Sequence, residues 1–177
     1  MTYTETGFLS GSLGGTSFSN AAVTVRTTAD TANVQYGLFL GAVPLWSNVG
    51  VTTIDIDGFE TATFNGSSLI GAFNENLSAF QPGMAAVGIC DITNLKGILG
   101  NYQTTELNYA LATENTFTGA SSAAPATFST TLGNLITTSA SGDATFTAAL
   151  ATVPEPSALA LLGLGTIGLI ARRRRTA

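Results

Sequence analysis

Histidine is absent from this chain of 177 residues, and cysteine occurs only once. Without histidine the chain cannot build Ser–His or Cys–His catalytic pairs, histidine metal sites or a histidine general base. The single cysteine, Cys90, excludes a disulfide within the chain, and its apolar surroundings predict a buried, inert thiol. The catalytic and metal-binding arrangements that depend on histidine are therefore excluded.

Charge is also scarce, at 10% of the residues, against about 25% in typical soluble domains. Residues 1–152 hold ten acids and two bases, Arg26 and Lys96, which gives −8; residues 153–177 hold one acid and four arginines, which gives +3. A body with two cations cannot neutralise a phosphate backbone, so nucleic acid is excluded as a partner. We therefore divide the chain into an acidic, Thr/Gly/Ala-rich body, residues 1–152, and a C-terminal segment, residues 153–177.

Residues 1–20 contain neither a basic region nor an apolar run of the kind that secretory signal peptides need. The residues that follow already have the character of the interior of a β-domain. We therefore expect the natural start of the protein to lie upstream, or a leader to have been removed.

The body is predicted to be built from β-strands, because short Val/Thr/Phe-rich runs alternate with Gly, Asn and Asp. The predicted strands are Ala21–Thr28, Asn33–Leu40, Val51–Ile56, Phe59–Phe64, Ser67–Phe73, Ala85–Ile92, Thr104–Leu111, Ala126–Leu132 and Ala144–Leu150. Loops are predicted at Gly41–Gly50, with Trp46 as an aromatic anchor, and at Gly119–Pro125. No body segment shows a helical apolar stripe. The expected fold is all-β, a single β-sandwich or jelly-roll-like domain followed by a C-terminal hydrophobic helix.

Two dipeptides give the sharpest local prediction within the body. Asp57-Gly58 and Asn65-Gly66 tolerate the positive φ angles of two-residue hairpin turns. Together they predict a three-stranded antiparallel meander over Val51–Phe73.

Candidate chemistry in the body is limited. Asp55, Asp57 and Glu60 offer hard oxygen ligands for calcium, but their spacing does not fit the EF-hand loop. We expect the polar face of a hairpin there, with no metal and no cofactor. Two alternatives to a purely structural surface or matrix body stay open. One is a carbohydrate-binding module that uses exposed aromatics, with Trp46, Tyr36 and Tyr102 as candidates. The weaker one is a hydrolase that uses two carboxylates.

The C-terminal segment contains an uncharged run, ALALLGLGTIGLIA, over residues 158–171. As a helix this run is about 21 Å long, which is short of the bilayer's hydrocarbon core of about 30 Å. Four arginines follow at once, and their long stems extend the span; they are Arg172, Arg173, Arg174 and Arg175. Such a cluster stays cytoplasmic under the positive-inside rule. The pattern predicts a hydrophobic helix that anchors residues 157–171 in the inner membrane and leaves the body outside the cytoplasm.

A proline-flanked acid precedes this run, and its four residues are Val153, Pro154, Glu155 and Pro156. The prolines favour extended backbone that an enzyme can grip. This motif, the apolar run and the terminal arginines occur in the order of the PEP-CTERM sorting signal of Gram-negative bacteria, which the segment resembles. The resemblance implies recognition by an exosortase, an integral-membrane transpeptidase-like enzyme, with cleavage near Pro154–Pro156. It also implies a cell-surface or extracellular protein of exopolysaccharide-rich, biofilm-forming bacteria. Together with the body's lack of catalytic arrangements, it predicts a non-enzymatic surface or matrix protein.

Overall fold

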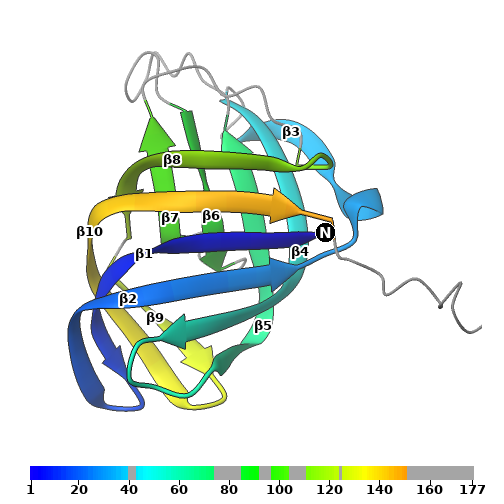
Figure 1. Ribbon diagram of the computed structural model, residues 1–177. Coiled ribbons are helices and arrows are strands. Elements are labelled where there is room, and N and C mark those ends of the chain that lie inside the picture. Colours follow the sequence, from blue (N-terminus) through cyan, green and yellow to red (C-terminus); the bar gives the residue numbers. More distant parts are fainter. Residues whose placement is uncertain (40–42, 74–84, 92–96, 104–110, 124, 151–177) are drawn as a thin grey trace, which may run out of the picture.

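The computed structural model describes residues 1–39, 43–73, 85–91, 97–103, 111–123 and 125–150. These residues form ten β-strands and one short 3-10 helical turn, η1, at Thr31–Asn33 (Figure 1). The strands are β1 Thr2–Leu13, β2 Thr16–Thr28, β3 Gln35–Phe39, β4 Val43–Ile56, β5 Ala62–Phe73, β6 Ala85–Asp91, β7 Gly97–Gln103, β8 Asn115–Ser122, β9 Ala126–Thr130 and β10 Gly133–Ala149. The expected all-β class is confirmed. The predicted C-terminal helix lies outside the described residues.

All ten strands belong to one antiparallel sheet, in the order β3-β4-β2-β1-β10-β8-β7-β6-β5-β9. The sheet closes on itself, because β4 also pairs with β5 and β10 also pairs with β9. Opposite walls of this one sheet therefore face each other across the core (Figure 1), where the sequence pattern predicts two separate sheets. Closure of this kind leaves few strand edges unpaired.

The strands β1 and β10 pair over the whole length of β1, from Thr2 opposite Ala149 to Leu13 opposite Leu135. On its other side β1 pairs with β2 through a tight hairpin. The two turn residues, Gly14 and Gly15, have φ angles of 58° and 89°, and two positive φ angles are the requirement of a type I′ turn. The first strand of the chain is thus held between its sequence neighbour and the last strand.

A glycine permits β1 to bend so that the sheet can close. The register of β1 shifts at Gly11 against both of its partners, which is the mark of a β-bulge. A Cβ atom at Gly11 would lie only 2.0 Å from the carbonyl oxygen of Ile136. Because any other side chain would collide with the β10 backbone there, glycine is required at this bend.

The hairpin between β4 and β5 has a turn at the first predicted dipeptide and none at the second. Its loop, residues 57–61, is longer than the predicted two residues, so the strand expected from Phe59 begins only at Ala62. Ile56 accepts a hydrogen bond from the N–H of Phe59 at 2.9 Å, and Gly58 has a φ of 84°. Asn65-Gly66, by contrast, lies inside β5, where the register against β4 shifts. The predicted meander is therefore a pair of strands, and the second dipeptide marks an irregularity within a long strand instead of a turn.

Further predictions of loops and strands need correction. Trp46 lies in β4 and not in a loop, because it pairs with Tyr36 of β3 on one side and with the β5 strand on the other. The predicted loop Gly119–Pro125 begins within β8, since β8 pairs with β10 up to Ala120. The strands β1, β7 and β8 were not predicted. Most of the predicted strand Thr104–Leu111 lies outside the described residues, and Leu111 itself follows no strand geometry, with a φ of 55°.

Side chains alternate across the sheet between an apolar interior and a polar, uncharged exterior. Aromatic contacts within the described interior include Tyr3–Phe146, Phe117–Phe146 and Phe64–Phe128, with ring centroids 5.9–6.3 Å apart. The exterior of β1, β2, β8 and β10 carries rows of threonines, and the register places Thr6 beside Thr145 and Thr118. Threonine suits a half-exposed pleated surface, which explains how a body with so few charges presents a polar face.

A buried polar network fixes one end of the interior. The Tyr3 hydroxyl donates to the Leu111 carbonyl oxygen at 2.6 Å and accepts from Asn48 Nδ2 at 3.0 Å. Asn48 Nδ2 also donates to the carbonyl oxygen of Asp30 at 3.0 Å. These bonds connect β1, β4, the start of η1 and the segment before β8. Buried hydrogen bonds of this kind specify one arrangement of their elements.

The described core contains one polar side chain without a partner. Glu5 of β1 is 0% exposed, and neither of its carboxylate oxygens has a hydrogen-bond partner. It lies opposite Val25 and Phe146, so the carboxyl group faces apolar neighbours. Burial raises the pKa of Glu5 well above its usual value of 4.5, because an apolar environment disfavours the charged form.

The pH dependence of stability tests the state of Glu5. The folded protein binds the Glu5 proton more tightly than the unfolded chain does, so proton binding at Glu5 favours the folded state, and this contribution is fully present below the unfolded pKa. Its contribution falls by about 1.4 kcal/mol per pH unit as pH rises from the unfolded to the folded pKa. We expect Glu5→Gln to flatten this dependence, and Glu5→Met to raise the free energy of unfolding at pH 7 by about 1–3 kcal/mol.

Urea unfolding from pH 4 to pH 9 measures both effects. Asp143→Asn, which removes an exposed acid of β10, is the matched control and should keep the wild-type slope. The other buried titratable groups in the described residues are Tyr3 and the N-terminal ammonium, which donates to the Ala29 carbonyl oxygen at 2.8 Å. A Glu5→Gln variant that keeps the wild-type pH dependence would show that Glu5 is not its source.

Candidate functional site

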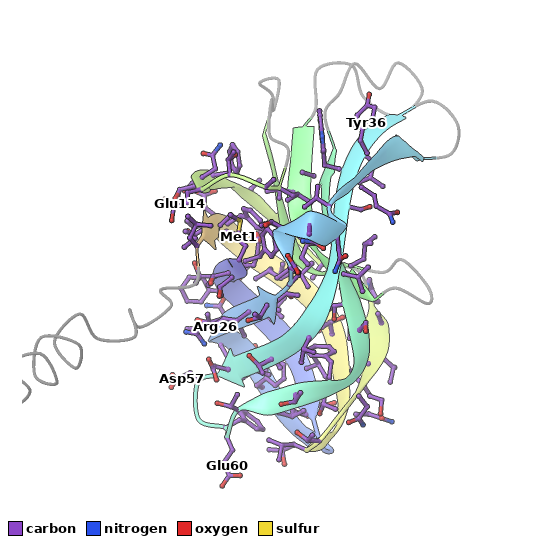
Figure 2. The ribbon with its side chains drawn as sticks, turned by 90° about the vertical axis from the view of Figure 1, so that its right-hand side faces the viewer. Met1, Arg26, Tyr36, Asp57, Glu60 and Glu114 are labelled. Atoms are coloured by element: carbon purple, nitrogen blue, oxygen red, sulfur yellow. The ribbon has the colours of Figure 1, made fainter. Side chains whose placement is uncertain are left out.

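The structure forms an aromatic pair from two of the predicted candidates. Tyr36 of β3 and Trp46 of β4 are cross-strand partners, and their ring centroids are 4.9 Å apart. Tyr36 is 62% exposed, whereas Trp46 is half-buried and packs against the core. Tyr36 lies at the end of the molecule opposite Glu60 (Figure 2). The pair therefore offers an exposed Tyr36 ring that packs beside the half-buried Trp46 ring.

The third aromatic candidate, Tyr102, lies in β7 opposite Ala86 of β6 and Ala120 of β8. Its side chain is outside the described part of the structure. Cys90 lies in β6 opposite Leu69 and Gly97, and the prediction of its buried thiol likewise concerns a side chain outside that part.

The acidic hairpin is arranged as a surface ion pair. Asp55 of β4 contacts the guanidinium of Arg26 and accepts a hydrogen bond from the Thr61 hydroxyl. The hydrogen bond from Thr61 and, to a lesser extent, the charge of Arg26 lower the pKa of the Asp55 carboxyl. Asp57 and Glu60 are exposed on the turn that follows. The Asp55 carboxylate is therefore already bound by a cation and a hydroxyl of the chain itself.

Three further acids of the described residues lie on separate elements. Glu5 faces the interior, Asp30 caps η1 by accepting from the N–H of Ala32 at 2.9 Å, and Glu114 precedes β8. Within the described residues no group of three or more His, Cys, Asp or Glu side chains could hold a metal ion.

The last described residues are fixed at the end of the sheet where β1 begins. Ala149 pairs with Thr2, and the N–H of Leu150 donates to Glu114 Oε1 at 3.0 Å. Figure 2 shows Met1 and Glu114 on the same side of the molecule. The body therefore leads into the C-terminal segment from a defined point.

The predicted sorting residues 153–156, the apolar run and the arginines 172–175 all lie outside the described residues. Within the described part, no helix has the length and hydrophobicity needed to cross a membrane. The sorting prediction is thus carried by sequence and not by geometry.

The comparison with protein families bears directly on this segment. A family profile described as the PEP-CTERM protein-sorting motif matches residues 152–175. The protein is therefore one that carries a C-terminal sorting signal. The signal is of the PEP-CTERM type, as its residues predict. No curated protein and no solved structure matches the chain.

The structural roles of two acids, Glu114 and Glu5, were not predicted. Glu114 was one acid among ten, and only the fold shows that it binds the backbone at Leu150. Glu5 sits in an alternating run, Tyr3-Thr4-Glu5-Thr6, and that period could have placed it on the interior face beside Tyr3. A charged residue on the apolar face of a strand is the signal that would have found it.

A substitution at Asp55 distinguishes the surface ion pair from a calcium site. We expect Asp55→Asn to lower the free energy of unfolding by less than about 1 kcal/mol, because exposed ion pairs contribute little. Added calcium should leave the melting temperature of both proteins unchanged, as measured by thermal unfolding. A calcium-dependent rise that is present in the wild type and lost in Asp55→Asn would contradict the ion-pair interpretation.

Proposed function

We propose that this protein is a non-enzymatic surface or extracellular-matrix protein, delivered by an exosortase that reads its C-terminal signal. The observation that carries the proposal is the PEP-CTERM match at residues 152–175. The three parts of the signal have separate roles. The proline-flanked acid is the recognised element, the apolar run anchors the precursor in the inner membrane, and the arginines stop transfer on the cytoplasmic side.

The recognised element suits an enzyme that binds extended chain. Pro154 and Pro156 fix their own φ angles and keep the residues before them out of helix. Glu155 places a single negative charge between the two rings. Cleavage there releases the body from its anchor, after which the body lies at the cell surface or outside the cell.

The body has the properties of a durable exported module. Its sheet is closed, so little strand edge is open to pairing with other chains. Its exterior is polar through threonine more than through charge, and the chain has no histidine with which to build the common catalytic pairs. These features support a structural role in a surface layer or matrix.

Substitution of the recognised element tests the sorting role. With Pro154, Glu155 and Pro156 all replaced by alanine, we expect the processed form to fall at least about tenfold, which corresponds to losing about 1.4 kcal/mol of recognition. The precursor should accumulate in the inner membrane. Immunoblotting of fractionated cells of the producing bacterium measures both forms.

Pro125→Ala replaces an exposed proline of the body and serves as the control. It should be processed like the wild type. Unchanged processing of the triple variant, or equal processing in cells that lack the exosortase, would overturn the proposal.

A second candidate function is binding of the exopolysaccharide that surrounds such cells. The observation that favours it is the Tyr36–Trp46 pair, in which an exposed ring is held at 4.9 Å from a half-buried one. Aromatic faces of this kind present a large apolar area together with a polar tip. A sugar ring could stack on Tyr36 while Trp46 keeps that ring in place.

Tyr36→Ala tests this second candidate without removing a core residue. Binding to the polysaccharide purified from the producing bacterium should weaken about fivefold to thirtyfold, the range of one or two kcal/mol. Phe8→Ala, which removes a ring that is 43% exposed on β1, is the matched control. Isothermal calorimetry measures the affinities, and equal affinity in all three proteins would exclude the site.

A further inference from the structure

Threonines form a regular array on the outer face of four neighbouring strands. The strands β2, β1, β10 and β8 lie side by side in this order (Figure 1). Alternate residues of a strand point to opposite faces, and the buried residues Val25, Glu5 and Phe146 mark the inward positions. The outward positions beside them are threonines except at Arg26 and Ala149. We call this array the threonine face, and its members are Thr2, Thr4, Thr6, Thr24, Thr28, Thr116, Thr118, Thr145 and Thr147.

The strand register aligns the threonine face in rows. One row crosses all four strands, each residue directly opposite the next, through Thr24, Thr6, Thr145 and Thr118. The adjacent row lies two residues along each strand and holds Arg26, Thr4, Thr147 and Thr116. Neighbouring strands are about 4.8 Å apart, and residues two positions apart along a strand are about 6.8 Å apart. The hydroxyl groups therefore repeat in two directions.

These rows lie on an unbroken part of the ladder. The pairing of β1 with both neighbours is regular from Thr2 to Thr6, and the first shift against β10 comes after Thr6. The bulge at Gly11, where β1 bends, lies further along the strand. The bend that closes the sheet therefore does not disturb the rows.

The side chains of the threonine face are already ordered in the free protein. Threonine is branched at Cβ, which restricts its χ1 angle. The hydroxyl oxygens of Thr118 and Thr145 are hydrogen-bonded at 3.1 Å, and the Thr6 hydroxyl donates to the Thr145 carbonyl oxygen at 3.4 Å. Since ordering flexible side chains is one of the costs of binding, a face of this kind binds a matching surface at a low entropic cost.

The chemistry of the threonine face restricts its partner. Each hydroxyl both donates and accepts hydrogen bonds, and each methyl group adds a small apolar contact. Within the two rows the only charged side chain is Arg26, which is paired with Asp55. The matching partner is therefore uncharged, consists of groups that donate and accept equally, and repeats in two directions.

Two macromolecular partners fit these requirements less well. Ligand sites in proteins are typically concave and lined by apolar and aromatic side chains, whereas the two rows hold no aromatic ring, and a single polysaccharide chain repeats in one direction only. A second copy of this chain would need a buried apolar or aromatic anchor at the centre of the contact. An ordered lattice of water molecules meets all three requirements.

We propose that the threonine face binds the surface of ice. Each oxygen of ice donates and accepts hydrogen bonds, and the two spacings of the threonine face are close to repeats of its oxygen lattice. The hydroxyls hold water molecules in lattice positions, the methyl groups fill the space between them, and this layer joins the crystal. This activity goes beyond the proposed function and is independent of it, because it belongs to the folded body alone.

Capture of the purified full chain by growing ice tests this proposal. A cooled probe grows an ice shell from a dilute protein solution, and the fraction of protein in the ice is compared with that of albumin. Thr6→Lys places a long charged side chain in the middle of the four-threonine row. Thr118→Lys does so at the exposed end of that row, and it serves alone if Thr6→Lys does not fold. Circular dichroism checks the fold of each variant.

Thr127→Lys is the matched control, because Thr127 is an exposed threonine of β9, outside the threonine face. All the variants keep residues 151–177, so any effect of that segment on capture is shared. We expect the wild type and Thr127→Lys to be captured equally and well above albumin. Each substitution within the row should lower the captured fraction at least about tenfold, which corresponds to about 1.4 kcal/mol of affinity.

Three results would overturn the proposal. The first is capture of the wild type at the level of albumin. The second is an equal loss of capture in Thr127→Lys and in the folded row variants, which would show that added charge acts without regard to position. The third is retention of the wild type on an uncharged polysaccharide, lost in the row variants, without capture by ice; this would assign the threonine face to a saccharide.

Discussion

The pairing of β1 with β10 is the constraint on which the rest of this structure depends. It joins the first strand to the last over almost their full lengths, from Thr2 and Ala149 to Leu13 and Leu135. Each of these strands then carries further partners: β2 beside β1, and β8 and β9 beside β10. The pairing thereby ties the two ends of the body together and sets where the C-terminal segment departs.

The same pairing carries the least favourable group in the described core. Glu5 of β1 lies between Val25 and Phe146 without a hydrogen-bond partner. Leaving a polar group buried and unpaired costs free energy, and a protonated carboxyl costs less than a charged one. Close packing of the surrounding apolar side chains and the backbone pairing of β1 with β2 and β10 offset this cost.

The sequence predicted single strands and turns better than it predicted which strands pair with each other. Alternation of Val23 and Val25 with polar residues identified β2, and Asp57-Gly58 identified a true turn, because both signals are local. Asn65-Gly66 has the same local signal, yet pairing with neighbouring strands carries β5 straight through it. Strand pairing overrides the local signal at Trp46 as well. The residues around it have the character of a turn, but its pairing with β3 and β5 places it in a strand.

The candidate site divides in the same way between local and long-range information. The sorting signal is contiguous, so residues 153–156 and the arginines were readable without any fold. The Tyr36–Trp46 pair needed the β3–β4 register, and the contact between Glu114 and Leu150 needed the closed sheet. Residues far apart in the chain become neighbours only through strand pairing, which composition and periodicity do not report.

The adjacency of β1 and β10 also orders events during synthesis. A chain that leaves a ribosome or a translocation channel N-terminus first exposes β1 long before its partner exists, since Thr2 and Ala149 are 147 positions apart (149 − 2). Such non-local contacts give a high contact order and slow folding. The sheet cannot close until Ala149 has emerged, and the matched sorting motif begins soon after it, at residue 152. The body therefore completes its fold at nearly the same time as the sorting motif emerges. Until then the chain stays unfolded enough to pass through a translocation channel.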